Sequence, residues 1–333
     1  MTTPLLALTE ARLTELLDRM TTVRTAIIGD LMLDRYLLGD VERISPEAPV
    51  PVVTVESEWD APGGAANVAA NVAALGATVL LAGVIGDDDA GETLRQALLG
   101  HDIDCTGVIE APGRPTTTKT RILARGQQVV RIDREVTNPL PLRVREALLV
   151  AAHQAIADAD VLLLEDYDKG VLDEGVIGDL IQAAIDQGVP VIADPKERHF
   201  FAFGGATVLK PNRRELEVAF KHQLGAEPRD LIEARNRLNV ENLLLTVGAD
   251  GLKLVSADGS VHHSPSIARS VYDVSGAGDT ITSWLGVALA AGGTMAEAAW
   301  LANLAAGVQV GKQGTATVSR DELLDAWDDL ASG

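Results

Sequence analysis

Short, unbroken runs of apolar residues alternate along this chain with longer stretches of helical length. The strand-like runs lie at residues 25–28, 78–82, 161–164, 190–193, 206–209 and 243–246. Helical stretches lie between them, for example at residues 143–157, 174–187 and 229–238. Apolar strands separated by helices are typical of a mostly parallel sheet that is covered on both faces. The pattern therefore predicts one α/β domain over residues 1–333, with ligands bound beyond the carboxyl ends of the strands.

Two β-rich stretches interrupt this alternation. Residues 44–55 hold three prolines within six positions and then a β-rich run, which predicts an extended edge strand. Residues 116–133 alternate around Arg125-Gly126, which predicts a hairpin. Together they predict a small β lid, built from about residues 36–57 and 114–133, over the active cleft. The edges of such a lid favour a homodimer in which two lids pair, although the sequence does not fix the oligomeric state.

Charge and composition narrow the range of partners. The formal charge of −20 argues against nucleic acid or an anionic membrane as the main partner, although an acidic surface can still surround a basic pocket. The single cysteine excludes an internal disulfide. We find no secretory signal, and the apolar window at residues 67–86 is expected to be a buried helix and strand rather than a membrane span. A cytoplasmic protein is therefore expected.

The strongest chemical signal is the segment at residues 275–280. Gly276 and Gly278 allow a tight turn before a helix, whose free N–H groups and dipole attract an anion. Asp279 falls in the first turn of this helix, where it is either a catalytic base or an ordinary acidic residue that favours the dipole. The motif alone leaves both interpretations open. The chain has neither a P-loop nor a dinucleotide-binding fingerprint, so any phosphate site depends on this late helix.

Polar residues near the first strands are candidates for contacts with sugar hydroxyls. Gly63 and Gly64 open another helix and let a ligand approach the backbone, and Asn67 can both donate and accept hydrogen bonds. An ordinary helix start with an interior asparagine is the alternative. Asp30 and Asp34 follow the first strand, where carboxylates suit sugar hydroxyls and where turn aspartates are also common.

A second set of polar residues is a candidate nucleotide site. Asn212 and Glu215 have the spacing of a helix capping box, which is a purely structural explanation of the pair. The functional interpretation places both near nucleotide phosphates, with Glu215 organising Mg²⁺ through water. Lys196 can supply an ammonium group that faces phosphate, and the turn at residues 246–251 can line the nucleotide edge through its backbone.

Taken together and in this order, these motifs resemble those of the ribokinase-like (PfkB-type) carbohydrate kinases, over about residues 24–319. The resemblance implies a Rossmann-like α/β domain with a β lid, and ATP and Mg²⁺ as cofactors. It implies that Asp279 is the base and that the amides around Gly276, Ala277 and Gly278 form an anion hole. It assigns Asn212, Arg213, Arg214 and Glu215 to ATP. The further candidates for ATP binding are Lys196, Thr246, Gly248, Gly251 and Asn303.

A narrower resemblance concerns the substrate. Residues 34–53, 118–121, 128–133 and 311–319 look like the kinase domain of D-glycero-β-D-manno-heptose 7-phosphate kinases, which phosphorylate the anomeric hydroxyl on the way to ADP-heptose and lipopolysaccharide core. A sugar phosphate needs cations, and the lid supplies Lys119, Arg121 and Arg131. The first two share one strand face. A solvated lid edge is the alternative explanation of these charges.

Two departures from the resemblance stand out. Bifunctional members carry a nucleotidyltransferase domain with a His-x-Gly-His motif, which this sequence lacks, so adenylyl transfer is not expected of it. Glu165 replaces the serine of the family's frequent Ser-Asp-Tyr segment. A hexose-phosphate or nucleoside kinase and a non-catalytic sugar sensor on the same fold remain alternatives, and a monovalent cation near Asp273 stays an open question.

Overall fold

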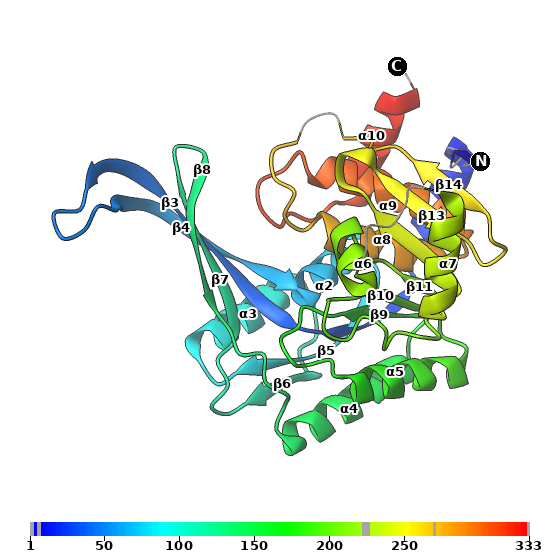
Figure 1. Ribbon diagram of the computed structural model, residues 1–333, viewed down its shortest axis with the longest axis horizontal. Coiled ribbons are helices and arrows are strands. Elements are labelled where there is room, and N and C mark those ends of the chain that lie inside the picture. The colour runs from blue at the N-terminus through cyan, green and yellow to red at the C-terminus, as the bar shows by residue number, and fades with distance from the viewer. Residues whose placement is uncertain (1–2, 5–7, 222–226, 269–270, 332–333) are drawn as a thin grey trace.

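The computed structural model describes residues 3–4, 8–221, 227–268 and 271–331. Within these residues the main sheet has the strand order β1-β14-β13-β12-β11-β10-β9-β2-β5-β6 (Figure 1). Neighbouring strands pair in parallel, except that β13 is antiparallel to both β12 and β14. The strands are β1 (Thr3–Pro4), β2 (Arg24–Gly29), β5 (Thr78–Gly86), β6 (Val108–Ala111), β9 (Val161–Glu165), β10 (Val191–Asp194), β11 (Val208–Leu209), β12 (Asn242–Thr246), β13 (Leu252–Val255) and β14 (Val261–Ser264). The mostly parallel sheet predicted from the apolar runs is confirmed.

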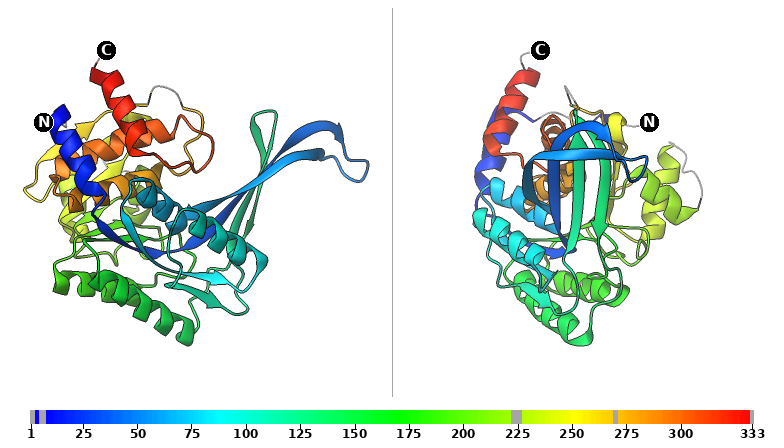
Figure 2. Two further views of the ribbon diagram at one scale, coloured as in Figure 1. Left: turned by 180° about the vertical axis from the view of Figure 1, so that it is seen from behind. Right: turned by 90° about the vertical axis from the view of Figure 1, so that its left-hand side faces the viewer.

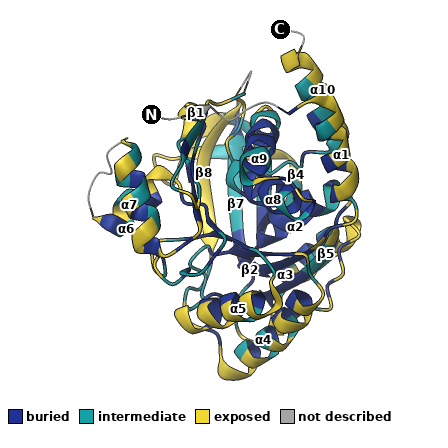
Figure 3. Cartoon of the chain, turned by 90° about the vertical axis from the view of Figure 1, so that its right-hand side faces the viewer, coloured by how far each residue is buried: buried dark blue, intermediate teal, exposed yellow. Residues whose placement is uncertain are grey.

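Helices cover both faces of this sheet because its strands are apolar on both sides (Figures 2 and 3). In β2, Ile27 packs into one core while Ala26 and Ile28 pack into the other. The first core is closed by α1 (Glu10–Met20), α2 (Ala65–Ala74), α3 (Asp89–Gly100), α8 (Ala277–Ala290), α9 (Met295–Gln309) and α10 (Arg320–Ala331). The second is closed by α4 (Leu142–Ala157), α5 (Glu174–Gln187), α6 (Arg213–Phe220) and α7 (Pro228–Leu238).

A second sheet extends from the domain as a long twisted ribbon (Figure 2). Its strand order is β4-β3-β7-β8, formed by β3 (Leu31–Ile44), β4 (Pro51–Gly64), β7 (Thr117–Ala124) and β8 (Gln127–Arg134). The hairpin predicted around Arg125-Gly126 is confirmed, and both turn residues have positive φ angles of 51° and 74°. We call these four strands the small sheet.

The prediction of one extended strand over residues 44–55 is wrong in part. Residues 45–50 form the turn at the tip of the β3–β4 hairpin, which the Ser45 N–H closes by donating to the carbonyl of Val50. Prolines 46 and 49 explain the break, because a proline has no N–H to donate to a neighbouring strand. The edge strand starts only at Pro51.

The apolar window at residues 67–86 forms most of α2, which packs in the first core, and β5, which lies between the two cores, so a buried helix and strand are found as predicted. None of the helices in the described ranges combines the length and the apolar character that a membrane crossing would require.

Candidate active site

The N-terminus of α8 faces the carboxyl ends of the central strands. Gly276 precedes it with a φ angle of 82°, a left-handed conformation that favours glycine, and an added Cβ would lie 3.0 Å from Nδ2 of Asn67. No side chain caps this helix. The amide of Ala277 donates to the carbonyl of Val274 at 3.3 Å, which leaves the amides of Gly278 and Asp279 to bind another group. The arrangement is a ready anion site.

The carboxylate of Asp279 lies in this first turn and is 4% exposed. Its Oδ1 accepts a hydrogen bond from the hydroxyl of Tyr167 at 2.5 Å, and its Oδ2 accepts one from Nδ2 of Asn67 at 2.6 Å. Burial raises the pKa of Asp279 to about 6, while both hydrogen bonds oppose the rise. At neutral pH the group is therefore mostly ionised, with a pKa suited to a general base.

Tyr167 owes its position to Asp30. The Asp30 carboxylate is fully buried and accepts the backbone N–H groups of Tyr167, Lys169 and Val171 at 2.7, 3.1 and 3.2 Å. These bonds hold the loop after β9 against the end of β2. The interpretation of Asp30 as a sugar ligand is therefore corrected, because both of its oxygens serve the backbone and neither is exposed.

Replacing Tyr167 with phenylalanine tests how far this hydroxyl tunes the base. Burial keeps the pKa of Tyr167 well above its usual value, so the group remains a hydrogen-bond donor. Without the donor, the pKa of Asp279 should rise, and the acidic limb of the kcat/KM profile should move to higher pH. Kinetics between pH 5 and 9 measure this shift. Tyr272→Phe, at an exposed tyrosine, is the control. An unmoved limb would contradict the tuning role.

Three charged residues that the sequence analysis did not assign surround Asp279. Glu165 and Asp194 end the neighbouring strands β9 and β10 and are register partners, and Lys210 follows β11. The Lys210 ammonium donates to Asp194 at 2.9 Å, and both side chains are buried. Carboxylate oxygens of Glu165, Asp194 and Asp279 lie within 4.8 Å of one another. The common signal is a polar residue at the end of an apolar run, which the sequence analysis used only for Asp30 and Asp34.

The predicted nucleotide residues divide into two groups. Asn212 and Glu215 form the capping box of α6, and Glu215 also accepts from the Lys196 ammonium at 2.5 Å. Lys196 in turn lies 5.1 Å from the centre of the Tyr167 ring, so this pair reaches the residues around the base. The capping role is thus observed, and it brings Glu215 next to the candidate site.

The remaining predicted nucleotide residues are more scattered. Arg213 and Arg214 are exposed in the first turn of α6. Thr246 forms an isolated parallel β-bridge with Asn212. The turn after β12 includes Gly248 and Gly251, both with positive φ. Asn303 on α9 donates to Oγ of Ser264 and to the carbonyl of Pro265, each at 2.7 Å, so its amide group fixes the end of β14.

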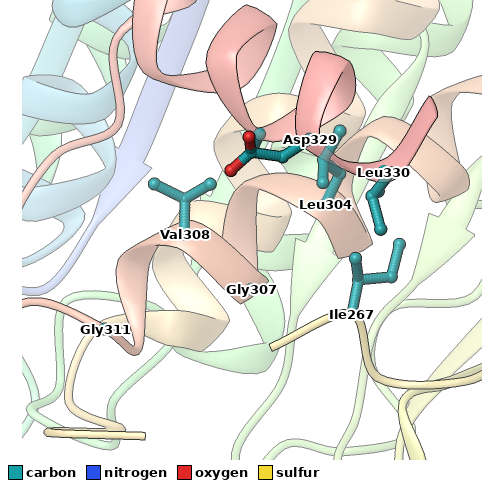
Figure 4. A pocket seen from close by; sticks show the side chains of 8 residues that line it. Ile267, Leu304, Gly307, Val308, Gly311, Asp329 and Leu330 are labelled. Atoms are coloured by element: carbon teal, nitrogen blue, oxygen red, sulfur yellow. The ribbon is translucent and has the colours of Figure 1, made fainter. Parts of the chain in front are cut away.

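Near Asn303, a cavity of about 190 Å³ lies between α9, α10 and the segment at Ile267 (Figure 4). Apolar side chains and two glycines make up most of its wall, which is formed by Ile267, Leu304, Gly307, Val308, Gly311, Ala326, Asp329 and Leu330.

Asp34, which the sequence suggested as a sugar ligand, lies on β3 of the small sheet. Its Oδ1 accepts from Nη1 of Arg121 at 2.7 Å, and both side chains are largely buried. Burial raises the pKa of Asp34, and Arg121 opposes the rise. Gly63 makes room for this carboxylate, because an added Cβ would lie 2.8 Å from its Oδ2. Gly64 has a φ of 57° at the start of α2.

The other two candidate cations of the small sheet, Lys119 and Arg131, are also paired. Lys119 contacts Asp133 and Glu135 at 3.3 Å, and its side chain is 14% exposed. Arg131 contacts Asp133 at 2.8 Å but is 48% exposed. The solvated-edge explanation therefore fits Arg131 and does not fit Lys119 or Arg121.

Comparison with known proteins places this site in a family. The sequence profile of the pfkB family carbohydrate kinases matches residues 24–322. The chain belongs to the pfkB family of carbohydrate kinases. It is therefore a kinase, and the family implies ATP as the phosphoryl donor. Because oxygen ligands are what Mg²⁺ prefers, the carboxylate of Glu215, which lies next to the site, fits the metal that accompanies ATP.

Sequence relatives and solved structures agree with this placement. The chain is 47% identical over 310 residues to bifunctional protein HldE of Azorhizobium caulinodans and 44% identical over 318 residues to bifunctional protein HldE of Paramagnetospirillum magneticum. These matches cover 92% and 94% of the chain but only 65% of each relative, so the chain spans just under two thirds of their length.

The fold is that of ribokinase. Arabidopsis thaliana ribokinase, solved with ribose and ATP, superposes with a TM-score of 0.73 at 21% identity, covering 92% of this chain and 99% of that one. Escherichia coli phosphofructokinase-2, solved with potassium, gives a TM-score of 0.75 at 20% identity, covering 93% and 99%. These two likenesses establish the fold alone.

Proposed function

We propose that this pfkB-family kinase transfers the γ-phosphoryl group of ATP to the anomeric C1 hydroxyl of D-glycero-β-D-manno-heptose 7-phosphate, giving heptose 1,7-bisphosphate for ADP-heptose and lipopolysaccharide core synthesis. The observation that carries the kinase chemistry is the Asp279 carboxylate, held by Tyr167 and Asn67 at the open N-terminus of α8. The assignment of a heptose as the substrate rests on the segments of the small sheet that resemble heptose 7-phosphate kinases. An ATP-dependent enzyme of this kind would act in the cytoplasm.

The mechanism gives separate tasks to the base, the helix amides and the residues around them. Asp279 accepts the proton of the attacking hydroxyl, and the amides around Gly276, Ala277 and Gly278 stabilise negative charge on the transferring group. Tyr167 and Asn67 keep the carboxylate oriented. Glu215 would hold Mg²⁺ through water, and this ion neutralises phosphate charge in phosphoryl transfer. The small sheet closes over the sugar and keeps water away from the reacting atoms.

The small sheet supports a phosphorylated substrate. In the pairing of β3 with β7, Asp34 is the register partner of Lys119, and Arg121 bonds to Asp34. A hydroxyl-binding carboxylate and two cations therefore meet at the base of the small sheet. We propose that Asp34 takes a sugar hydroxyl, together with the backbone at Gly63 and Gly64, and that Lys119 and Arg121 attract the 7-phosphate. Asp273 is less suited to a monovalent cation, because its two oxygens already accept the N–H groups of Ser275 and Gly314.

A substrate panel tests the proposed function. ADP release should be fastest with heptose 7-phosphate and much slower with the unphosphorylated heptose, fructose 6-phosphate, ribose or adenosine. Turnover confined to unphosphorylated sugars would reject the proposed substrate. Sugar binding without any ADP release would instead favour a sugar sensor.

The variant Lys119→Met tests whether Lys119 attracts the phosphate group of the substrate or only supports the structure of the small sheet. Losing a cation near the substrate should raise the KM for the sugar phosphate about tenfold, equivalent to about 1.4 kcal/mol, while the KM for ATP stays unchanged. Steady-state kinetics with each substrate varied in turn measure both values. Arg125→Met is the matched control, because Arg125 is a cation of the same sheet that pairs with Asp40 at the exposed hairpin turn. An equal KM for the sugar phosphate in both variants would contradict the role of Lys119.

We also propose that two copies pair through their small sheets. The sheet exposes several large apolar side chains, and Val55 at 49%, Val130 at 44% and Ile132 at 55% are among them. Exposed apolar strands of this kind are typical of interfaces. The variant Ile132→Asp should shift the protein from dimer to monomer in light scattering, while Val150→Asp, on exposed α4, should not. A monomeric wild type would contradict the pairing.

A further inference from the structure

Glu165 is a buried acid that the mechanism above leaves without a defined task. It is the last residue of β9, it has no exposed surface, and neither carboxylate oxygen has a hydrogen-bond partner. The nearby hydroxyl of Thr282 donates to the carbonyl of Gly278 instead. Burying a carboxylate without a partner costs several kcal/mol, so some other group must compensate it.

The surroundings of Glu165 carry an excess of negative charge. Its carboxylate shares a cluster with those of Asp194 and Asp279, whose ligand oxygens all lie within 4.8 Å of one another. Lys210 is the buried ammonium bonded to this cluster, at Asp194. Lys196 is nearby but is paired with Glu215. Three carboxylates and one ammonium therefore leave a formal charge of about −2 when all of them are ionised.

We infer that Glu165, with Asp194 and the adjacent Asp279, binds a divalent cation of the Mg²⁺ class in the absence of nucleotide. A single such ion would balance the charge of the cluster, whereas one proton on Glu165 would leave it negative. Mg²⁺ prefers oxygen ligands and is commonly held by one or two carboxylates, with water filling the other positions. The unpartnered oxygens of Glu165 are the ones that are free to act as ligands.

This site is distinct from the one proposed for Glu215. The two carboxylate oxygens of Glu215 already accept hydrogen bonds from Lys196 and from the backbone N–H of Asn212. The inference rests on the carboxylate geometry and not on which sugar the kinase uses.

Mn²⁺ provides a direct probe, because its EPR signal reports the free ion. Titration of the full, nucleotide-free chain should show one Mn²⁺ bound per chain and displaced by Mg²⁺. Glu165→Gln and Glu165→Ser should each weaken this binding at least tenfold. Glu215→Gln should retain it, as should Glu146→Gln, a matched change at an exposed glutamate on α4. Thermal unfolding of each variant checks that it is folded.

The outcomes separate this inference from the proposed function. No Mn²⁺ binding without nucleotide, or equal binding by wild type and Glu165→Gln, would overturn the site and leave the substrate assignment untouched. Unchanged binding combined with a more stable Glu165→Gln variant would show that Glu165 is compensated by a proton. If both Glu165 variants fail to fold, anomalous scattering from Mn²⁺-soaked wild-type crystals decides, since a peak beside Glu165 supports the site and its absence overturns it.

Discussion

Asp279→Asn should lower kcat by about three orders of magnitude, within the range usually lost when a general base is removed. Asparagine keeps the size of the side chain and its contact with Tyr167, but it cannot accept the proton of the sugar hydroxyl. Binding of ATP and of the sugar phosphate should therefore remain close to that of wild type, as calorimetry with each ligand can show. The loss should appear in kcat, because the missing interaction is made only during proton transfer.

The matched control is Asp89→Asn. Asp89 lies in the first turn of α3, as Asp279 does in α8, but it is exposed. Its replacement should leave kcat unchanged. Near-normal turnover of Asp279→Asn would show that the acid serves only the helix dipole. The wild-type profile adds a second check, because kcat/KM should fall as the pH drops through about 6, where Asp279 becomes protonated.

Lys210→Met should have the largest effect on stability, lowering the free energy of unfolding by about 3–5 kcal/mol at neutral pH. Lys210 is 3% exposed and is the ammonium bonded to Asp194. Methionine fills much of the same volume but leaves three buried carboxylates, of which Asp194 has lost its donor. Urea unfolding of wild type and variant measures the difference. Lys221→Met, at an exposed lysine, should change stability little.

The deficit of Lys210→Met should depend on pH in a defined direction. Burial already raises the pKa of Glu165 and Asp279 in the folded chain above their usual values, and Lys210 opposes that rise. The folded state therefore holds more protons than the unfolded state, so stability declines as the pH rises through the folded pKa values. Protonation at low pH removes the repulsion, and the deficit should be smaller at pH 5.5 than at pH 8. A deficit that is independent of pH would contradict this explanation.

Local features of the site follow from sequence because their causes lie within a few residues. The start of α8 at the glycines before Asp279, the capping box of Asn212 and Glu215 and the turn at Arg125-Gly126 are all set by neighbouring positions. The same holds for the apolar strands of the sheet. The tip at residues 45–50 was missed because prolines are compatible with both an edge strand and a turn.

Contacts between distant segments could not be predicted in this way. Tyr167 and Asp279 are 112 positions apart, and Asn67 and Asp279 are 212 positions apart. Asp30 and Asp34 look equivalent in sequence, but one holds the loop after β9 and the other faces Arg121. Only the packing of β2, β3 and β9 distinguishes them. The role of Lys210 could not be predicted either, because its acidic partner, Asp194, lies on another strand.

The small sheet also determines where the chain tolerates insertions and deletions. Strand β3 runs from Leu31 to Ile44. Its pairing with β4 stays in register from Leu31 to Leu38, and successive side chains along this part point to opposite faces. One residue added between Asp30 and Asp34 would turn Asp34 to the other face and away from Arg121, whereas residues added at the 45–50 tip would leave the register below them intact. Variation in length among relatives of this kinase should therefore accumulate at the tip, and the segment between Asp30 and Asp34 should keep a constant length.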